Sequence, residues 1–145
     1  MQEFNAMKKV AIDMCARGEV EPRIKHLVEA FNRLPGICTI SSCGGHEVID
    51  NQTQSPADGF NIDFVVDNEN GGMNSLRLIT KMARITGGEN IIIITWHNPS
   101  NLSAFTIDGK NNASPDKFAK ALEIALDSKI EYDKARSRDP FYWWG

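Results

Sequence analysis

Residues 22–41 read PRIKHLVEAFNRLPGICTIS and contain the clearest helix-to-strand transition in the chain. Apolar residues in the first part recur at spacings of three and four, which places them on one face of a helix: Ile24, Leu27, Val28, Phe31 and Leu34. Pro22 suits a first helical turn, and the pair Pro35-Gly36 ends the helix. The β-branched run that follows predicts a short strand over residues 37–41.

This order of elements occurs a second time along the chain. Outside the quoted stretch, the hydrophobic patterns predict a helix over residues 2–17, a half-buried strand over 60–66, a helix over 74–87, strands over 91–96 and 102–108, and a helix that begins at residue 115 with Ser114 as its cap. We therefore expect an α+β fold with two helix–strand–strand units and a C-terminal helix. The four strands would form a mixed or antiparallel sheet with the helices packed on it.

The repeat also predicts where polar residues gather. His46 and His97 each follow the first strand of a unit, so we expect them at the same edge of the sheet, with Trp96 nearby. The apolar run of residues 91–96 is typical of a central strand covered on both faces. Asp63 alternates with apolar residues, which predicts a solvated carboxylate on the opposite face of the sheet. His26 is expected at the surface.

Length and composition indicate one ordinary globular domain. The chain has 145 residues, and we expect a single domain over residues 1–139 followed by an aromatic tail over 140–145. A net charge of −3 disfavours a strongly basic nucleic-acid binder. The absence of a long apolar run or a secretory signal, together with an odd number of cysteines, predicts a cytoplasmic protein that does not bind membranes. Residues 36–75 contain no Lys or Arg, which indicates either a solvated acidic region or a site for a cation.

The turn after the first strand is the main candidate for a binding site. The turn reads Ser42-Cys43-Gly44-Gly45-His46, and the candidate site also includes Ser41 at the end of the strand. Two glycines allow positive φ and close approach of a ligand to the backbone, and we expect positive φ at Gly44 or Gly45. Exposed N–H groups in such a turn can bind an anion, assisted by the two serines and by His46 as a donor. The alternative is a tight structural turn with a buried cysteine.

Residues 18–46 resemble the opening of the wybutosine-synthesis methyltransferase family, whose loop reads Ser-Ser-Cys-Ser-Gly-Arg. Ser41, Ser42, Cys43 and Gly45 match that loop, whereas Gly44 replaces a serine and His46 replaces the arginine. The resemblance implies a related fold, a site at this loop, S-adenosylmethionine as cofactor and modification of tRNA. It leaves open whether this chain is an enzyme, and a non-catalytic binding or assembly protein that keeps the fold is the alternative.

Cysteines and histidines suggest two other chemistries. Cys38, Cys43, His46 and His97 are ligand types that zinc accepts, although their spacing lacks a C-x-x-C pair. Cys43 is also a candidate nucleophile, with His46 or His97 as the activating base. We therefore take Cys43 and His46 as candidate catalytic residues. The candidate ligand-binding residues are Ser41, Ser42, Gly44, Gly45, Trp96 and His97.

The end of the chain carries four consecutive aromatic residues: Phe141, Tyr142, Trp143 and Trp144. Aromatic side chains of this size bury on the order of 150–250 Å² each, so we expect the tail either to fold back over the domain or to form a homodimer contact. Basic residues precede it, and stacking on RNA bases is a third expectation.

Overall fold

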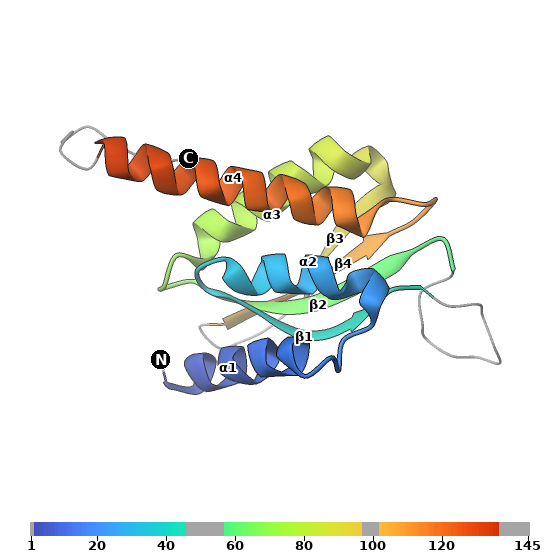
Figure 1. The fold of residues 1–145 in the computed structure, drawn as a ribbon, viewed down its shortest axis with the longest axis horizontal. Coiled ribbons are helices and arrows are strands. Elements are labelled where there is room, and N and C mark those ends of the chain that lie inside the picture. Colours follow the sequence, from blue (N-terminus) through green and yellow to red (C-terminus); the bar gives the residue numbers. More distant parts are fainter. Residues whose placement is uncertain (1, 46–56, 97–101, 137–145) are drawn as a thin grey trace.

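The structure, a computed structural model, describes residues 2–45, 57–96 and 102–136 of the chain (Figure 1). The predicted elements appear in the predicted order. In sequence they are α1 (Gln2–Ala16), α2 (Pro22–Arg33), β1 (Ile37–Cys43), β2 (Phe60–Asp67), α3 (Gly72–Gly87), the short 3₁₀ helix η1 (Gly88–Asn90), β3 (Ile91–Trp96), β4 (Leu102–Gly109) and α4 (Pro115–Arg136).

The four strands form one antiparallel sheet in the order β1-β2-β4-β3. The α+β class and the C-terminal helix are therefore confirmed, and the sheet is antiparallel rather than mixed. The central strands β2 and β4 pair along their whole length, from Phe60 opposite Gly109 to Asp67 opposite Leu102. The second strands of the two units, β2 and β4, pair with each other in the centre of the sheet. The first strands, β1 and β3, therefore lie at its two edges.

Strand β3 is an edge strand, so the prediction of a central, doubly covered strand was wrong. Ile91 and Ile93 pack with the main core, whereas Ile92 points to the other face and is 45% exposed. A run of isoleucines occurs both in central strands and in edge strands with one exposed face. Hydrophobicity alone therefore did not reveal that β3 is an edge strand.

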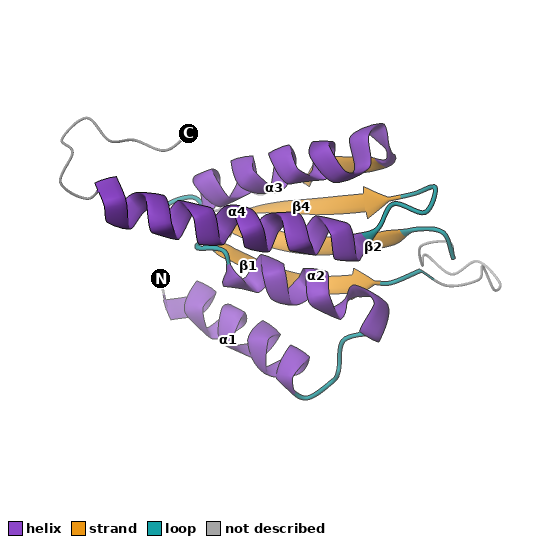
Figure 2. Cartoon of the chain, turned by 45° about the horizontal axis from the view of Figure 1, so that its top comes forward, coloured by secondary structure: helices purple, strands orange, loops and turns teal. Residues whose placement is uncertain are grey.

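Helices cover the two faces of the sheet unequally. Figure 1 shows α2, α3 and α4 on one side and α1 on the other. Figure 2 shows α4 lying between α2 and α3, and α4 packs against both of them. In the same view, α4 begins at the end of the sheet to which the β4 arrow points and runs past the opposite end.

A chain of phenylalanines links the sheet to its outermost helix. Phe105 stacks on Phe64 across the β4–β2 pair, with ring centroids 5.6 Å apart. Phe31 of α2 meets Phe64 edge-on at 5.2 Å, and Phe118 of α4 meets Phe31 edge-on at 5.7 Å. Edge-to-face contacts of this kind add to the hydrophobic stabilisation by burial. These rings tie the sheet, α2 and α4 into one core.

Helix α1 rests on the other face through a smaller apolar cluster. Phe4 and Ala11 pack on Cys38 of β1 and Val65 of β2. Lys8 adds a hydrogen bond from Nζ to the carbonyl oxygen of Leu34, at 2.7 Å, and burial lowers the pKa of this lysine. Helix α1 therefore covers the β1 side of this face. Within the described ranges, no helix is long and apolar enough to cross a membrane.

Two glycines permit close contact between the α2–β1 turn, the end of β2 and the start of α3. A Cβ atom on Gly36, whose φ is +71°, would lie 2.5 Å from the backbone nitrogen of Gly72. A Cβ atom on Gly72 would lie 2.2 Å from the carbonyl oxygen of Asp67. Because real Cβ contacts are longer, glycine is required at both places.

Candidate functional site

The turn that the sequence singled out begins later than predicted. Ser42 and Cys43 pair with Ile62 and Asn61, so both belong to β1 rather than to the turn. Gly45 has a φ of +96°, which confirms the predicted positive φ, and His46 lies outside the described residues. Glycine suits position 45 because this backbone conformation disfavours a side chain.

Glu21, the residue before α2, holds this turn in place. Its Oε2 atom accepts a hydrogen bond from the backbone N–H of Gly44 at 3.1 Å. A Cβ atom on Gly44 would lie 3.1 Å from the Cβ atom of Arg23 and 3.2 Å from Glu21 Oε2. The predicted anion-binding role does not fit Gly44, because a carboxylate already occupies its N–H.

A β-bulge in β1 opens a cavity next to this carboxylate. The register shifts between Thr39 and Ser41, and the extra residue, Ile40, is 53% exposed. A cavity of about 280 Å³ lies between this part of β1, the C-terminal half of α1 and the segment that joins α1 to α2. Its apolar lining residues are Ala11, Met14, Val20, Val28 and Ile40, and its polar lining residues are Glu19, Glu21, Thr39, Ser41 and Ser42. We call it the β1 pocket.

The β1 pocket contains two of the predicted ligand-binding residues, Ser41 and Ser42. Its volume lies just below the range of drug-sized ligand sites, so it suits a small ligand or one end of a larger one. The sequence did not indicate the contribution of α1 or of Glu21. Their part in the pocket depends on tertiary packing, because residues 11–21 reach β1 only when α1 packs on the far face of the sheet.

Ser41 also belongs to a polar row across the sheet face that α1 partly covers. Its hydroxyl donates to Asp63 Oδ2 at 2.6 Å, and Thr106 Oγ1 donates to Asp63 Oδ1 at 2.6 Å. Asp63 lies on the predicted face, but it is half-buried with two hydroxyl donors rather than freely solvated. Burial, and then the neighbouring charge of Asp63, raises the pKa of Asp108 on the next strand. The row places the carboxyl groups of Asp63 and Asp108 on neighbouring strands, β2 and β4.

The described ends of β1 and β3 lie at opposite ends of the sheet. The prediction that His46 and His97 share one side of the sheet concerns two residues outside the described part and stays a prediction. Cys43 is level with Asn61, Asp108 and Ile92, whereas Trp96 is level with Ala104, Val65 and Cys38. Corresponding strands of the two units run in opposite directions because the units join through the antiparallel β2–β4 pair. The side chain of Trp96 and the whole of His97 lie outside the described residues.

The cysteines do not form one metal site. Cys38 and Cys43 are free and buried, and they pair with Val65 and Asn61, which are four residues apart on β2. That separation is about 13 Å along a strand, too far for two sulfurs to bind one zinc ion. Among the residues that the structure describes, no cluster of three or more His, Cys, Asp and Glu could hold a metal. His46 and His97 are the other two candidate zinc ligands and also the two candidate bases for Cys43. Both lie outside the described residues.

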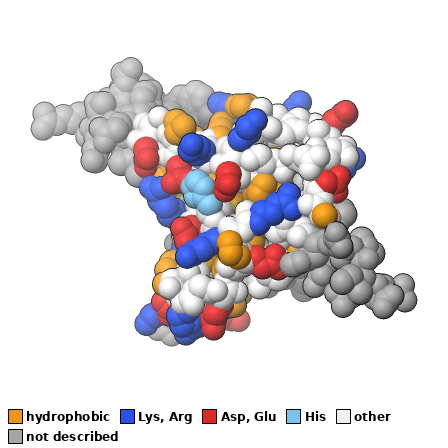
Figure 3. Space-filling model, turned by 45° about the vertical axis from the view of Figure 1, so that its right-hand side comes forward, with side chains coloured by type: hydrophobic (Ala, Val, Ile, Leu, Met, Phe, Trp, Pro, Cys, Tyr) orange, Lys and Arg blue, Asp and Glu red, His pale blue; other side chains and the backbone are white. Residues whose placement is uncertain are grey.

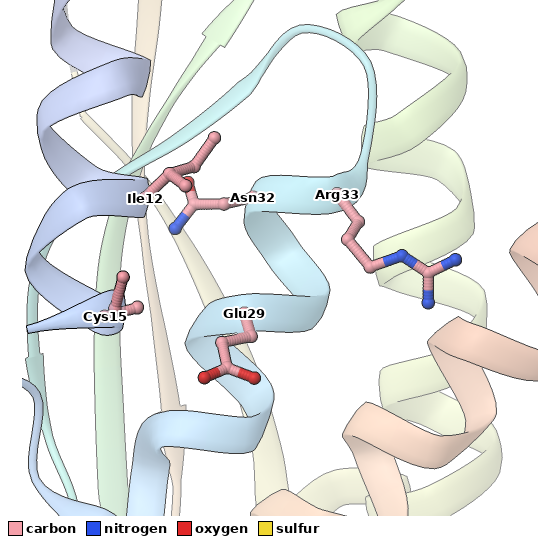
Figure 4. Close-up of a pocket in the computed structure, with 6 residues that line it drawn as sticks. Ile12, Cys15, Glu29, Asn32 and Arg33 are labelled. Atoms are coloured by element: carbon pink, nitrogen blue, oxygen red, sulfur yellow. The ribbon is translucent and has the colours of Figure 1, made fainter. Parts of the chain in front are cut away.

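A second cavity, of about 340 Å³, lies in the groove between α1 and α2. Figure 4 shows Ile12 and Cys15 on the α1 side and Glu29 and Asn32 on the α2 side, with Arg33 directed away from α1. Asn32 donates to the Val28 carbonyl oxygen and to Thr39 Oγ1. Its amide is therefore committed to holding α2 against β1.

Charged side chains also join α2 to α4 at the surface. His26, predicted to be a surface residue, has a 38% exposed side chain whose Nε2 contacts Glu123 and whose Nδ1 lies 3.5 Å from Asp116 Oδ1. Arg33 Nη2 lies 3.1 Å from Asp127 Oδ1. Figure 3 shows acidic and basic side chains mixed around the histidine. Such mixed, exposed pairs act as weak links between helices.

The chemistry of the β1 pocket has to be inferred from its own geometry. Carboxylates, hydroxyls and apolar side chains converge there from α1, the α1–α2 segment and β1. No family model, no curated protein and no solved structure matches the chain.

Proposed function

We propose that this chain is a ligand-binding domain whose site is the β1 pocket. Its ligand is a small molecule with an apolar part and a positively charged group. The observation that carries the proposal is the Glu21 carboxylate, which lines the cavity while Gly44 N–H holds it in place. A positioned carboxylate in a partly apolar pocket favours a cationic group, because charge-assisted hydrogen bonds are about twice as strong as neutral ones.

S-adenosylmethionine is the ligand that we propose first. The resemblance over residues 18–46 implies this cofactor. Its sulfonium and ammonium groups carry the positive charge that the pocket favours, and its carboxylate would have to face away from Glu19 and Glu21. Its methionyl end is small enough for a cavity of about 280 Å³, with the remainder extending out of the pocket. The aliphatic part of that end would lie against Met14 and Ile40.

Methyl transfer to RNA, which the resemblance also implies, is not part of this proposal. Glu19 and Glu21 line the β1 pocket, although Glu19 is paired with Arg17, and carboxylates at this position disfavour a phosphate group there. The chain as a whole has a net charge of −3. We therefore propose small-molecule binding as the function of this pocket and make no assignment of a second substrate.

Calorimetric titration tests the proposal directly. We expect S-adenosylmethionine to bind more tightly than S-adenosylhomocysteine, which lacks the methyl group on sulfur and, with it, the sulfonium charge. The Glu21→Gln variant should weaken binding by about 10-fold to 100-fold, because a hydrogen bond to a charged group is worth about 1.5–3 kcal/mol.

The matched control is Glu29→Gln, which alters a carboxylate that lines the other cavity. It should leave the affinity unchanged. If neither cofactor binds, the cofactor assignment is wrong. If Glu21→Gln binds as the parent does, the charge-based assignment of the pocket is wrong. If the two compounds bind equally well, the sulfonium is not the group that Glu21 favours.

A further inference from the structure

The aromatic tail predicted over residues 140–145 lies outside the described residues, so its expected contacts with the domain, with a second copy or with RNA stay predictions. Within the described ranges, the outer edge of β1 faces the β1 pocket. Ser41 lies opposite Asp63, on the sheet face that α1 partly covers. Ser42 lies opposite Ile62, which is buried in the main core on the other face. Both serines line the pocket, together with residues of α1 and α2, so the edge of β1 forms one of its walls.

Two hydrogen bonds show which backbone groups of this edge point away from β2. The Thr39 N–H donates to Asn32 Oδ1 at 3.1 Å. The Gly44 N–H donates to Glu21 Oε2, also at 3.1 Å. Neither N–H is therefore used to pair with β2, and both are already occupied by side chains of this molecule.

Ser42 lies between these two positions, and its backbone also points outwards. In an antiparallel strand, one residue directs its N–H and C=O to the partner strand and the next residue directs them away. Because Ser42 is two residues before Gly44, its N–H and C=O point away from β2, on the side of the pocket that Ser42 lines. Within the described ranges, no side chain accepts a hydrogen bond from the Ser42 N–H.

The β-bulge brings Ser42 into this position. Without the extra residue, Ile40, the alternation that starts at Thr39 would direct the backbone of Ser41 outwards and that of Ser42 towards β2. The bulge reverses the alternation, so the outward-facing residue is the one next to Glu21 and Gly44.

The order of polar groups along this wall matches an α-amino acid. The Ser42 N–H is a donor, the Ser42 carbonyl oxygen that follows is an acceptor, and the Glu21 carboxylate held at Gly44 comes next. Two residues of a strand span about 7 Å, so one small ligand can reach all three groups. A ligand carboxylate suits the donor, and an ammonium group suits the two acceptors.

The rest of the lining suits an aliphatic side chain. Its apolar residues are Ala11, Met14, Val20, Val28 and Ile40, and the cavity measures about 280 Å³. Glu19, the other carboxylate of the lining, pairs with Arg17 at 3.0 Å, which reduces its repulsion of a ligand carboxylate.

We propose that the β1 pocket binds its ligand by an α-amino acid group, with the ligand carboxylate on the Ser42 N–H and the ammonium group between the Ser42 carbonyl oxygen and Glu21. An unbranched aliphatic side chain then lies in the apolar part of the cavity. This inference rests on the proposed function and narrows its ligand from any apolar cation to a molecule that carries an α-amino acid group.

Two small compounds test the proposal in NMR titrations of the full chain. L-Norleucine carries both charged groups on an unbranched aliphatic chain, and pentylamine is the same molecule without its carboxylate. We expect L-norleucine to bind about 10-fold to 100-fold more tightly than pentylamine, because only its carboxylate can accept from the Ser42 N–H. Glu21→Gln should weaken the binding of both compounds, whereas the matched control Glu29→Gln should weaken neither.

Amide hydrogen exchange tests the backbone contact itself. In the free protein, the amide of Ser42 should be less protected than those of Ser41 and Cys43, which face β2. Saturating L-norleucine should slow the exchange of the Ser42 amide about tenfold. Saturating pentylamine should leave this exchange at the rate of the free protein.

The outcomes separate this inference from the proposed function. Equal affinities for L-norleucine and pentylamine, with both weakened by Glu21→Gln, would overturn the inference and leave the proposed function intact. Protection of the Ser42 amide in the free protein equal to that of Ser41 and Cys43 would show that it faces β2, which also overturns the inference. If neither compound binds, the inference is overturned, and the titration with S-adenosylmethionine decides separately whether the proposed function stands.

Discussion

At position 45, the backbone angle φ explains why the residue is glycine. Gly45 has a φ of +96°, and an L side chain in the left-handed region costs about 1–2 kcal/mol. Gly45→Ala should therefore lower the free energy of unfolding by about that amount, as measured by denaturant titration. Gly45→Asn should lose less, because asparagine adopts positive φ more readily than alanine. Equal stability of Gly45→Ala and the parent would contradict this account of the turn.

Asp108 makes stability depend on pH in a defined direction. Burial and the charge of Asp63 raise its pKa in the folded protein, so the folded state disfavours the ionised form. Above the raised pKa this cost is fully present, and below the ordinary pKa of aspartate, about 3.9, it is absent. Asp108→Asn should therefore be more stable than the parent at neutral pH.

The advantage of Asp108→Asn should shrink as the pH falls through the raised pKa of Asp108 and disappear below the ordinary pKa of aspartate, about 3.9. Chemical denaturation across this range measures it. An advantage that stays constant with pH would show that the carboxylate charge is not its source.

At the scale of elements, α4 is held by packing more than by charge. Phe118 is fully buried against Phe31, whereas Arg33 is an exposed partner of Asp127 and Glu123. Phe118→Ala should cost about 3–5 kcal/mol, and Arg33→Ala about 0.2–1 kcal/mol. Unfolding titrations at low and high salt measure both, and only the Arg33 effect should fall with salt. A larger loss for Arg33→Ala would reverse this ranking.

Helix α1 is the element that couples stability to the proposed site. Phe4 is 2% exposed in the smaller apolar cluster, and Phe4→Ala should cost about 3–5 kcal/mol. Val10, on the same helix, is 56% exposed, and Val10→Ala should change stability by less than about 0.5 kcal/mol. Because α1 supplies Ala11 and Met14 to the β1 pocket, Phe4→Ala should also weaken ligand binding. If Phe4→Ala binds the ligand as tightly as the parent does, the packing of α1 does not contribute to the site.

At the scale of the whole molecule, periodicity predicted the elements but not their neighbours. The apolar stripe of residues 24–34 and the alternation of residues 60–66 were sufficient to identify α2 and β2. Pairing is decided by tertiary contacts, so the sequence did not reveal that β3 is an edge strand or that β1 and β3 end on opposite sides. The same reason explains why Ser41 and Ser42 were predicted for the site whereas Glu21 and α1 were missed.

The central claim is that the β1 pocket binds a cationic small molecule, with S-adenosylmethionine proposed first. The most direct measurement is an NMR titration of the backbone amides of the full chain with this cofactor. The account predicts that the largest saturable shifts occur at Glu21, Ser41, Ser42 and Gly44, and that Glu21→Gln abolishes or weakens them. The largest shifts in the groove between α1 and α2, or no saturable shift at all, would contradict it.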